Sequence, residues 1–406
     1  MNFRIFAATA IVFSMLFTAC SSDDEVITPV DQVDPVSDEV IVSENINTDT
    51  EWCDNVYVLG GRIAVEAGAT LTICPGTIVK GQAGTGVNAT ALLVARGAKL
   101  MAEGTADAPI IFTSVADNIS LDNIAAGEFA SPNLDPDFNG LWGGVIVLGN
   151  ATISASNDND EDVSEVQIEG IPSSDAKGLY GGNNDEDNSG VMTYISIRHG
   201  GANIGEGNEI NGLTLGGVGS GTVISNIEVV ANQDDGIEWF GGTVNVSNVV
   251  VWNAGDDAID TDQAWSGTLD NFVVVTPSGS CFELDGPEGT YVARHTIQNG
   301  TVAAIFNGRV IGGSLIDTDN GTPVDMKNVH FLAPLDESGE FLTMTDDEVA
   351  AATFENITFA TDESNLTSIM EQGGAIPAGI SAGGSSKADV SGLGWTWASI
   401  AGGLDF

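Results

Sequence analysis

Basic residues are scarce in this chain. Its 406 residues include 11 Lys and Arg against 58 Asp and Glu, which gives a formal net charge of −47. Such a surface repels phosphate backbones and anionic lipid headgroups, so the charge argues against nucleic acid as a partner. It attracts divalent cations instead. The 42% hydrophobic content and the 51 glycines indicate a folded, turn-rich chain and not an acidic disordered one.

Long hydrophobic runs are missing after residue 20. Residues 1–19 contain one basic residue and then an apolar run that ends in small residues, which predicts a signal peptide. The segment Leu16–Cys20 resembles a lipobox, in which the cysteine is acylated and becomes the mature N-terminus. We therefore expect a lipoprotein anchored through Cys20. An ordinary signal peptide that happens to contain a cysteine is the alternative.

Residues 20–50 are polar and acidic and include two prolines, which is typical of a flexible, lipidated tether. The sequence SSDDE at 21–25 resembles the acidic signal that sends lipoproteins of the Bacteroidota to the outer face of the outer membrane. The resemblance implies a lipid-anchored protein of the outer membrane that faces the cell exterior.

Cysteines are few, at positions 20, 53, 74 and 281. Cys53 and Cys74 are separated by about one turn of the repeat described below, so a disulfide between neighbouring turns is one prediction for an exported protein. The other is that both stay reduced. Cys281 has apolar neighbours, which is typical of a small buried hydrophobic residue.

Helical periodicity is poor, whereas short β-rich runs recur with turns between them. Between positions 222 and 294 the runs repeat at a nearly constant spacing, so that Glu238 aligns with Asp260 and Asp260 with Glu283. A β-sandwich gives no reason for such a repeat. We predict an all-β fold, a right-handed parallel β-helix with coils of about 22 residues, as a single domain over 51–406. Loop excursions are expected at 152–190 and at 333–375, the second with a short helix, and Trp395 and Trp397 are expected to cap the last coil.

Several segments are similar to a family of β-helix lipoproteins from the Bacteroidota. They include AKLMAEGTADAPIIFTS (98–114), GLWGGVIVLGNA (140–151), DDGIEWFGGTVNVSNVVVWNAGDDAIDTDQAWSG (234–267) and GWTWASIAGG (394–403). The resemblance covers about residues 50–406. It implies a surface lipoprotein of the right-handed parallel β-helix type and no particular activity.

Acidic residues recur at matching positions of successive coils. The series consists of Asp234, Asp235, Glu238, Asp256, Asp257, Asp260, Asp262, Glu283 and Asp285. Stacked carboxylates about 4.8 Å apart repel by about 3.5 kcal/mol per pair at an effective dielectric of 20. Solvation, a raised pKa or a bound cation such as Ca²⁺ would relieve this repulsion, and in the last case these residues are the predicted metal ligands. The alternative is that Asp residues occupy the turns for backbone reasons, because their side chains bond to nearby amides.

A catalytic interpretation stays open as a second alternative. Gly255-Asp256-Asp257 resembles the paired aspartates of β-helix polygalacturonases, in which carboxylates act as acid and base. The chain departs from that family, because it lacks an Arg-x-Lys element and has Arg198-His199-Gly200-Gly201 upstream of the aspartates. No Lys or Arg lies between residues 199 and 293, where a lyase needs a base. No catalytic residue is predicted on the leading interpretation.

Three tryptophans, Trp239, Trp252 and Trp265, share the acidic region. Exposed rings there would stack on sugars, whereas buried ones would fill the core. The leading functional prediction is a non-catalytic surface lipoprotein that binds a ligand, glycan or partner protein and is stabilised by calcium. The alternatives are a polysaccharide hydrolase or lyase that uses the acidic series, and a structural accessory of an outer-membrane protein complex.

Overall fold

The computed structural model describes residues 39–406, apart from 158, 173, 205–209, 333–341 and 346–348. The signal peptide predicted at 1–19, Cys20 and the tether up to residue 38 lie outside the described residues. Within the described part, no helix has the length and hydropathy needed to cross a bilayer.

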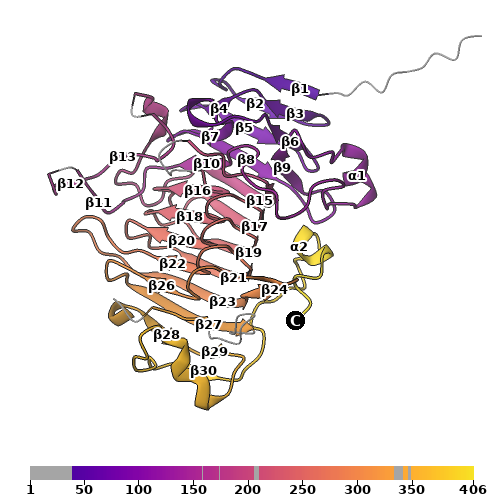
Figure 1. Cartoon of the computed structure of the whole chain (residues 1–406). Coiled ribbons are helices and arrows are strands. Elements are labelled where there is room, and N and C mark those ends of the chain that lie inside the picture. The colour runs from indigo at the N-terminus through magenta and orange to yellow at the C-terminus, as the bar shows by residue number, and fades with distance from the viewer. Residues whose placement is uncertain (1–38, 158, 173, 205–209, 333–341, 346–348) are drawn as a thin grey trace, which may run out of the picture. The chain divides into compact units, whose positions relative to one another are not determined.

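Short parallel strands stack into two sheets that wrap around one core (Figure 1). Sheet A holds sixteen strands. Twelve of them follow one another as neighbours: β1 (Glu39–Val42), β3 (Val56–Leu59), β6 (Ile78–Gly81), β9 (Ile110–Ser114), β15 (Gly190–Arg198), β17 (Val223–Val230), β19 (Val246–Trp252), β21 (Thr268–Val275), β23 (His295–Ala303), β27 (Val324–Leu332), β29 (Ile357–Phe359) and β30 (Ile380–Ala382). The other four extend it sideways: β2 (Thr50–Trp52), β5 (Thr70–Ile73), β8 (Lys99–Glu103) and β28 (Thr353–Glu355).

Sheet B holds eight shorter strands. In spatial order they are β26 (Asp317–Thr318), β22 (Phe282–Leu284), β20 (Ile259–Asp262), β18 (Ile237–Phe240), β16 (Leu213–Gly216), β10 (Val145–Leu148), β7 (Ala91–Val94) and β4 (Arg62–Val65). The chain alternates between the two sheets, and the neighbouring strands within each sheet pair in parallel, as in β15 with β17 and β18 with β20. The predicted right-handed parallel β-helix is therefore confirmed.

A column of asparagines marks a bend near the middle of the long strands of sheet A. Each strand from β15 to β27 along this sheet has one residue with positive φ near its middle: Tyr194, Asn226, Asn248, Asn271, Asn299 and Asn328; Asn356, between β28 and β29, continues the series. Asparagine tolerates this left-handed conformation better than most residues. The amides also bond along the column, since Asn271 donates to Asn248 and Asn328 donates to Asn299. This column lets each coil turn without an inserted loop.

The core fills the space between the sheets with alternating inward residues. Val249 and Val251 of β19, for example, meet Ile237 and Trp239 of β18 in one buried cluster. Close packing limits the size of the side chain at position 300, because a Cβ on Gly300 would come within 2.0 Å of the Phe272 ring on the neighbouring strand.

The coils are less uniform than the predicted repeat. In the middle of the stack, the bonded pair Asn248 and Asn271 gives a step of 23 along the chain. The next coils are longer, since the bonded pair Asn299 and Asn328 gives a step of 29. Longer coils arise because loops leave the stack at sheet edges and return in register.

Two domain boundaries differ from those predicted. β1 and β2 lie in sheet A, so the β-helix begins near residue 39. The prediction that residues 39–50 belong to a flexible tether is therefore wrong. Within 333–375, β28 and β29 pair with β27, so the solenoid continues through a range predicted as an excursion. The helical turns described there are 3₁₀, η3 (Val349–Ala351) and η4 (Glu363–Ile369).

Other excursions leave the stack between β9 and β15. The first contains α1 (Leu121–Ala126), which Ser120 begins with a capping box and Gly127 ends. The range 152–190 holds two short hairpins, β11 (Ala155–Ser156) with β12 (Asp162–Val163) and β13 (Val166–Gln167) with β14 (Leu179–Tyr180). The described part also has the 3₁₀ turns η1 (Gly86–Asn88) and η2 (Ala176–Gly178), and the hairpin of β24 (Ile305–Phe306) with β25 (Arg309–Val310).

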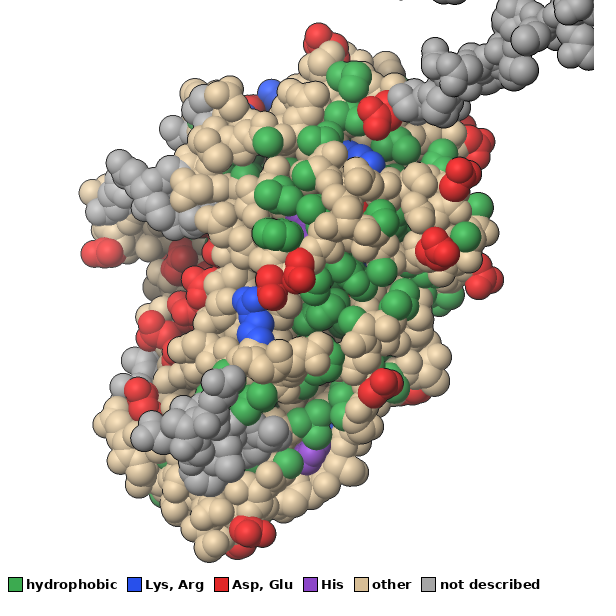
Figure 2. All heavy atoms as spheres, turned by 45° about the vertical axis from the view of Figure 1, so that its right-hand side comes forward, with side chains coloured by type: hydrophobic (Ala, Val, Ile, Leu, Met, Phe, Trp, Pro, Cys, Tyr) green, Lys and Arg blue, Asp and Glu red, His purple; other side chains and the backbone are tan. Residues whose placement is uncertain are grey.

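The C-terminal segment runs back along the outer side of sheet A and ends beside α2 (Trp397–Ile400), as the yellow trace in Figure 1 shows. Thr301 accepts a hydrogen bond from the Lys387 amide, and Glu228 accepts one from the Ala398 amide. Figure 2 shows hydrophobic side chains gathered on this side of the molecule. The prediction that Trp395 and Trp397 cap the last coil is wrong, because Trp397 packs on strands in the middle of the stack.

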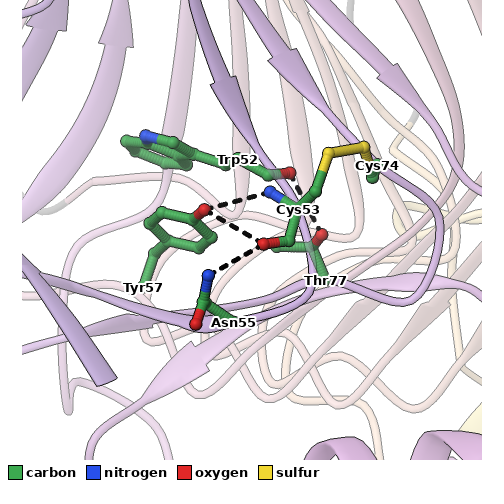
Figure 3. The surroundings of a disulfide bond; sticks show 6 residues. All are labelled: Trp52, Cys53, Asn55, Tyr57, Cys74 and Thr77. Atoms are coloured by element: carbon green, nitrogen blue, oxygen red, sulfur yellow. Dashed lines mark hydrogen bonds between the residues drawn. A yellow bond between two sulfur atoms is a disulfide. The ribbon is translucent and has the colours of Figure 1, made fainter. Parts of the chain in front are cut away.

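A disulfide joins the first two coils. β2 pairs with β5, and Cys53 and Cys74 follow these strands with their Cα atoms 5.0 Å apart and their sulfur atoms bonded (Figure 3). The ring of Tyr57 stacks on Trp52, with centroids 4.8 Å apart, and its hydroxyl accepts the amide hydrogen of Cys53. The predicted pairing is thus present, and Cys281 is buried and unpaired.

Candidate functional site

Carboxylates form a column on the outer face of sheet B. Strand register pairs Glu238 of β18 with Asp260 of β20, Asp260 with Glu283 of β22, and Glu283 with Asp317 of β26. The neighbours of these residues along each strand, such as Ile237 and Trp239, point into the core, so the carboxylates point outward. The predicted alignment of Glu238, Asp260 and Glu283 is confirmed, and Asp317 continues it.

A second column lies in the turns that precede these strands. The amide of Asp257 donates to Asp235 Oδ1 at 2.9 Å, and the amide of Ser280 donates to Asp257 Oδ1. Each side chain therefore holds the backbone of the next coil. The turn interpretation therefore holds for these two residues, whose carboxyl groups also bond to neighbouring carboxyls, Asp235 to Asp260 and Asp257 to Glu283.

The two columns meet in a buried cluster. Oxygens of Asp235, Glu238 and Asp260 lie within 4.8 Å of one another, although these residues are only 6%, 6% and 7% exposed. Among the described residues, Oδ1 of Asp260 is buried and has no hydrogen-bond partner. Asn211, which is fully buried, donates through Nδ2 to Glu238, and its own Oδ1 has no partner within the described part of the chain. Buried oxygens with open lone pairs are costly unless something binds them.

Burial and mutual repulsion raise the pKa of the cluster. The pKa values of Asp235, Glu238 and Asp260 lie well above their usual range, first because burial removes solvent and then because neighbouring carboxylates repel their charge. A hydrogen bond with Asp257, followed by burial, raises the pKa of Glu283 to about 10. The folded cluster therefore holds protons more strongly than the same groups do in water, and a bound cation would compete with those protons.

More exposed carboxylates surround the cluster. Asp234 and Asp256 bring oxygens within 4.8 Å of Asp235. Burial raises the pKa of Asp262 to about 7 and that of Asp285 to about 6, and in both cases nearby carboxylates add to the shift. We call the outer surface formed by Asp234, Asp235, Glu238, Asp256, Asp257, Asp260, Asp262, Glu283, Asp285 and Asp317 the acidic face.

A loop and an excursion border the acidic face. Gln263 donates to Glu288 and accepts a hydrogen bond from the Tyr180 hydroxyl at 2.9 Å. The backbone amide of Thr290 donates to Asp162 in the β11–β12 hairpin. The loop after β22 is thus tied to the excursion at 152–190, and together they form a wall beside the carboxylates.

The tryptophans predicted to bind sugar do not line the acidic face. Trp239 and Trp265 are 0% and 1% exposed and stack on each other in the core, with ring centroids 4.8 Å apart. Their prediction as sugar contacts is wrong, because the side chain of Trp239 alternates with Glu238 and must point inward. Trp252 is also not the exposed ring that was predicted, since it lies on the outer side of sheet A against Phe306 and Trp397.

Basic groups lie away from the carboxylate column. The described salt bridges include none to Glu238, Asp260 or Glu283. Arg198, from the upstream Arg-His-Gly-Gly element, is buried on sheet A, where it donates to Ser196 and lies 3.6 Å from Glu228. The arrangement on the acidic face can bind a cation through carboxylate oxygens.

Comparison with known families agrees with this architecture. The family model for a pectate-lyase-like β-helix domain matches residues 44–127 and 129–392. Because the match covers most of the chain, the chain belongs to this family. Neither the curated proteins nor the solved structures contain a match to it.

Proposed function

We propose that this member of the pectate-lyase-like β-helix family is a non-catalytic surface lipoprotein that binds a ligand, glycan or partner protein and holds a calcium ion on its acidic face. One observation carries the proposal: a buried carboxylate, Asp260, has an oxygen without a partner among the residues that the structure describes, and its oxygens lie within 4.8 Å of those of two other acidic side chains. Membership of the family is compatible with a carbohydrate-related role.

The donor chemistry supports calcium. Ca²⁺ takes six to eight oxygen ligands from carboxylates, amide carbonyls and water. Asp235, Glu238 and Asp260 would supply carboxylates, and Asn211, which is bonded to Glu238, would supply an amide oxygen. A divalent cation also neutralises charge that the sequence leaves uncompensated, because no Lys or Arg lies between residues 199 and 293.

The position of Asp256 and Asp257 supports a binding role over catalysis. Asp257 is 5% exposed and one of its oxygens holds the Ser280 amide, so it is restrained as part of a turn. A lyase on this fold needs a base next to the acidic residues, and the basic side chain of Arg198 is buried on the other sheet.

Calcium titration tests the cation. Protein stripped with EDTA is expected to bind Ca²⁺ in calorimetry, with release of protons, because the ion displaces them from the cluster. Asp260→Asn should weaken binding at least tenfold. Asp187→Asn is the matched control, since Asp187 is also buried but lies outside the acidic face. An absence of Ca²⁺ binding by the wild-type protein would remove this part of the proposal.

Cleavage assays test the non-catalytic role. The protein is incubated with neutral and acidic polysaccharides, and reducing ends and unsaturated products are measured. We expect no turnover. Turnover that disappears in the Asp256→Ala and Asp257→Ala variants would replace the binding role with an enzyme.

Labelling and surface proteolysis test the location. Radiolabelled palmitate should be incorporated into the wild-type protein and not into Cys20→Ala, because acylation needs the thiol. Protease added to intact cells should degrade the wild-type protein if it faces the exterior. Full protection in intact cells, with degradation after lysis, would contradict exposure at the surface.

A further inference from the structure

A pocket opens on the outer side of sheet A, on the opposite sheet from the acidic face. Its volume is about 320 Å³. Four separate segments build it: the loop at 135–137, the end of β19, the turn between β24 and β25, and α2. Its lining includes Trp252, Phe306, Trp397, Asn253, Arg309 and Asp137.

Aromatic rings form one side of the pocket. Trp252 contacts Phe306 and Trp397 edge to face, with ring centroids 6.2 Å and 5.8 Å apart. Trp252 and Trp397 are almost buried by these contacts, and Phe306 on the short hairpin remains partly accessible. The rings therefore give the pocket a fixed apolar wall.

Planar polar groups also line the pocket and are held in place. Arg309 donates through Nη1 to Asp137 and through Nη2 to Ser278, both at 2.6 Å. Asn253 donates to the same oxygen of Asp137 at 2.9 Å, and its own Oδ1 accepts a hydrogen bond from Thr276. Such a network reduces the entropy lost when a ligand binds.

The charge of the lining limits the class of ligand. The lining contains two acidic residues, Asp135 and Asp137, and one basic residue, Arg309, and the chain as a whole has a formal net charge of −47. Anions such as phosphates and uronic acids are therefore disfavoured. Cations gain little from the aromatic wall, because the rings pack against one another and Arg309 lies beside them. A neutral ligand with an apolar face and a hydroxylated edge suits both the aromatic rings and the polar groups of the lining.

We infer that this pocket binds a neutral pyranose residue of a glycan. The volume lies at the lower end of the range for ligand sites, which suits one or two sugar rings. The C–H face of the ring would lie against Phe306, and its hydroxyls would bond to Arg309 and Asp137, whereas both Nδ2 hydrogens of Asn253 are used by Asp137 and the Pro136 carbonyl. The inference rests on the proposed binding role but not on calcium, because the pocket contains no member of the acidic face.

Saturation-transfer NMR on the full chain tests the inference. The probes are methyl pyranosides of glucose, galactose, mannose and N-acetylglucosamine with their β- and α-linked disaccharides, and galacturonate is the charged comparator. At least one neutral probe should bind, and galacturonate should not compete with it. Phe306→Ala and Arg309→Gln should each weaken binding at least tenfold.

Phe354→Ala is the matched control, because Phe354 is also a half-buried phenylalanine on a short strand but lies outside the pocket. It should bind sugar as the wild-type protein does. Protein that is folded and binds Ca²⁺ but none of the neutral probes would overturn this inference alone. Binding that neither pocket variant weakens, or a preference for galacturonate, would also overturn it. Release of a cleaved product would instead contradict the non-catalytic role.

Discussion

The effect of Asp260→Asn on the free energy of unfolding should change sign when calcium is added. Oxygens of Asp235, Glu238 and Asp260 lie within 4.8 Å of one another. At that distance an ionised pair repels by about 3.5 kcal/mol at an effective dielectric of 20. Because raised pKa values keep part of the cluster protonated, only part of this repulsion acts near neutral pH. Without calcium, the amide should therefore stabilise the protein by about 1–3 kcal/mol at pH 8.

With calcium, the wild-type protein should be more stable than the Asp260→Asn variant. An ion at one hundred times its dissociation constant stabilises the wild-type protein by about 2.7 kcal/mol. For a body of about 370 residues with an unfolding entropy of about 2 cal/mol/K per residue, this raises the melting temperature by about 4 °C. The variant lacks one carboxylate ligand and should lose most of this gain.

Differential scanning calorimetry in EDTA and in calcium measures both effects on the same protein. Asp187→Asn serves as the control, because Asp187 accepts hydrogen bonds from Asn150 and Ser189 and its loss should lower both melting temperatures equally. If Asp260→Asn lowers stability by the same amount with and without calcium, Asp260 is a structural hydrogen-bonding residue and the reasoning fails.

Three other perturbations have expected outcomes. In EDTA, the free energy of unfolding should fall as the pH rises from 4 to 7. The pKa of Asp262 is raised to about 7 and that of Asp285 to about 6, so the folded protein holds protons that the unfolded chain releases. Thermal melts at a series of pH values measure this, and a rise in stability over that range would contradict it. Cys53→Ser should cost up to about 3 kcal/mol in guanidinium unfolding, since the bond to Cys74 closes a loop with a sequence separation of 21, while calcium affinity stays unchanged. Trp265→Ala should cost about 3–5 kcal/mol because it leaves a cavity in the core, and a loss below about 1 kcal/mol would mean that the ring is not packed there.

The sequence predicts the fold well where the coils are short and regular. The alignment of Glu238 with Asp260 and Glu283 is correct because those coils are nearly equal in length and carry no inserted loop. It predicts less where loops leave the stack. Ile110 and Ile195 pair directly in sheet A although a long stretch of chain separates them, and no local pattern shows which part of that stretch returns to the sheet.

The asparagine column could have been found from the sequence. Asn226, Asn248 and Asn271 follow one another at the same spacing as Glu238, Asp260 and Glu283. A search for equal spacing among all polar residues, and not only among acidic ones, would have located the bend in sheet A.

The error over the tryptophans has a simple geometric cause. Residues next to each other in a strand point to opposite faces, so Glu238 and Trp239 cannot both line one outer surface. That conflict is visible in the sequence. The contact of Trp397 with Trp252 is different, because it depends on the C-terminal segment returning across sheet A, and no periodicity encodes that path.

In this parallel β-helix, side chains of the same type stack on neighbouring strands. Whether this stabilises or destabilises the fold depends on the side chain. In the asparagine column this is favourable, because each amide has both a donor and an acceptor and Asn271 can bond directly to Asn248. Ionised carboxylates have only acceptors, so Glu238, Asp260 and Glu283 can stack only by sharing protons or a cation. If turn and strand geometry alone set these positions, asparagine or glutamine would fill them without repulsion, as asparagine does at the bend of sheet A. The use of carboxylates on sheet B therefore favours a role for their charge, and cation binding is the role that their buried, unpartnered oxygen supports.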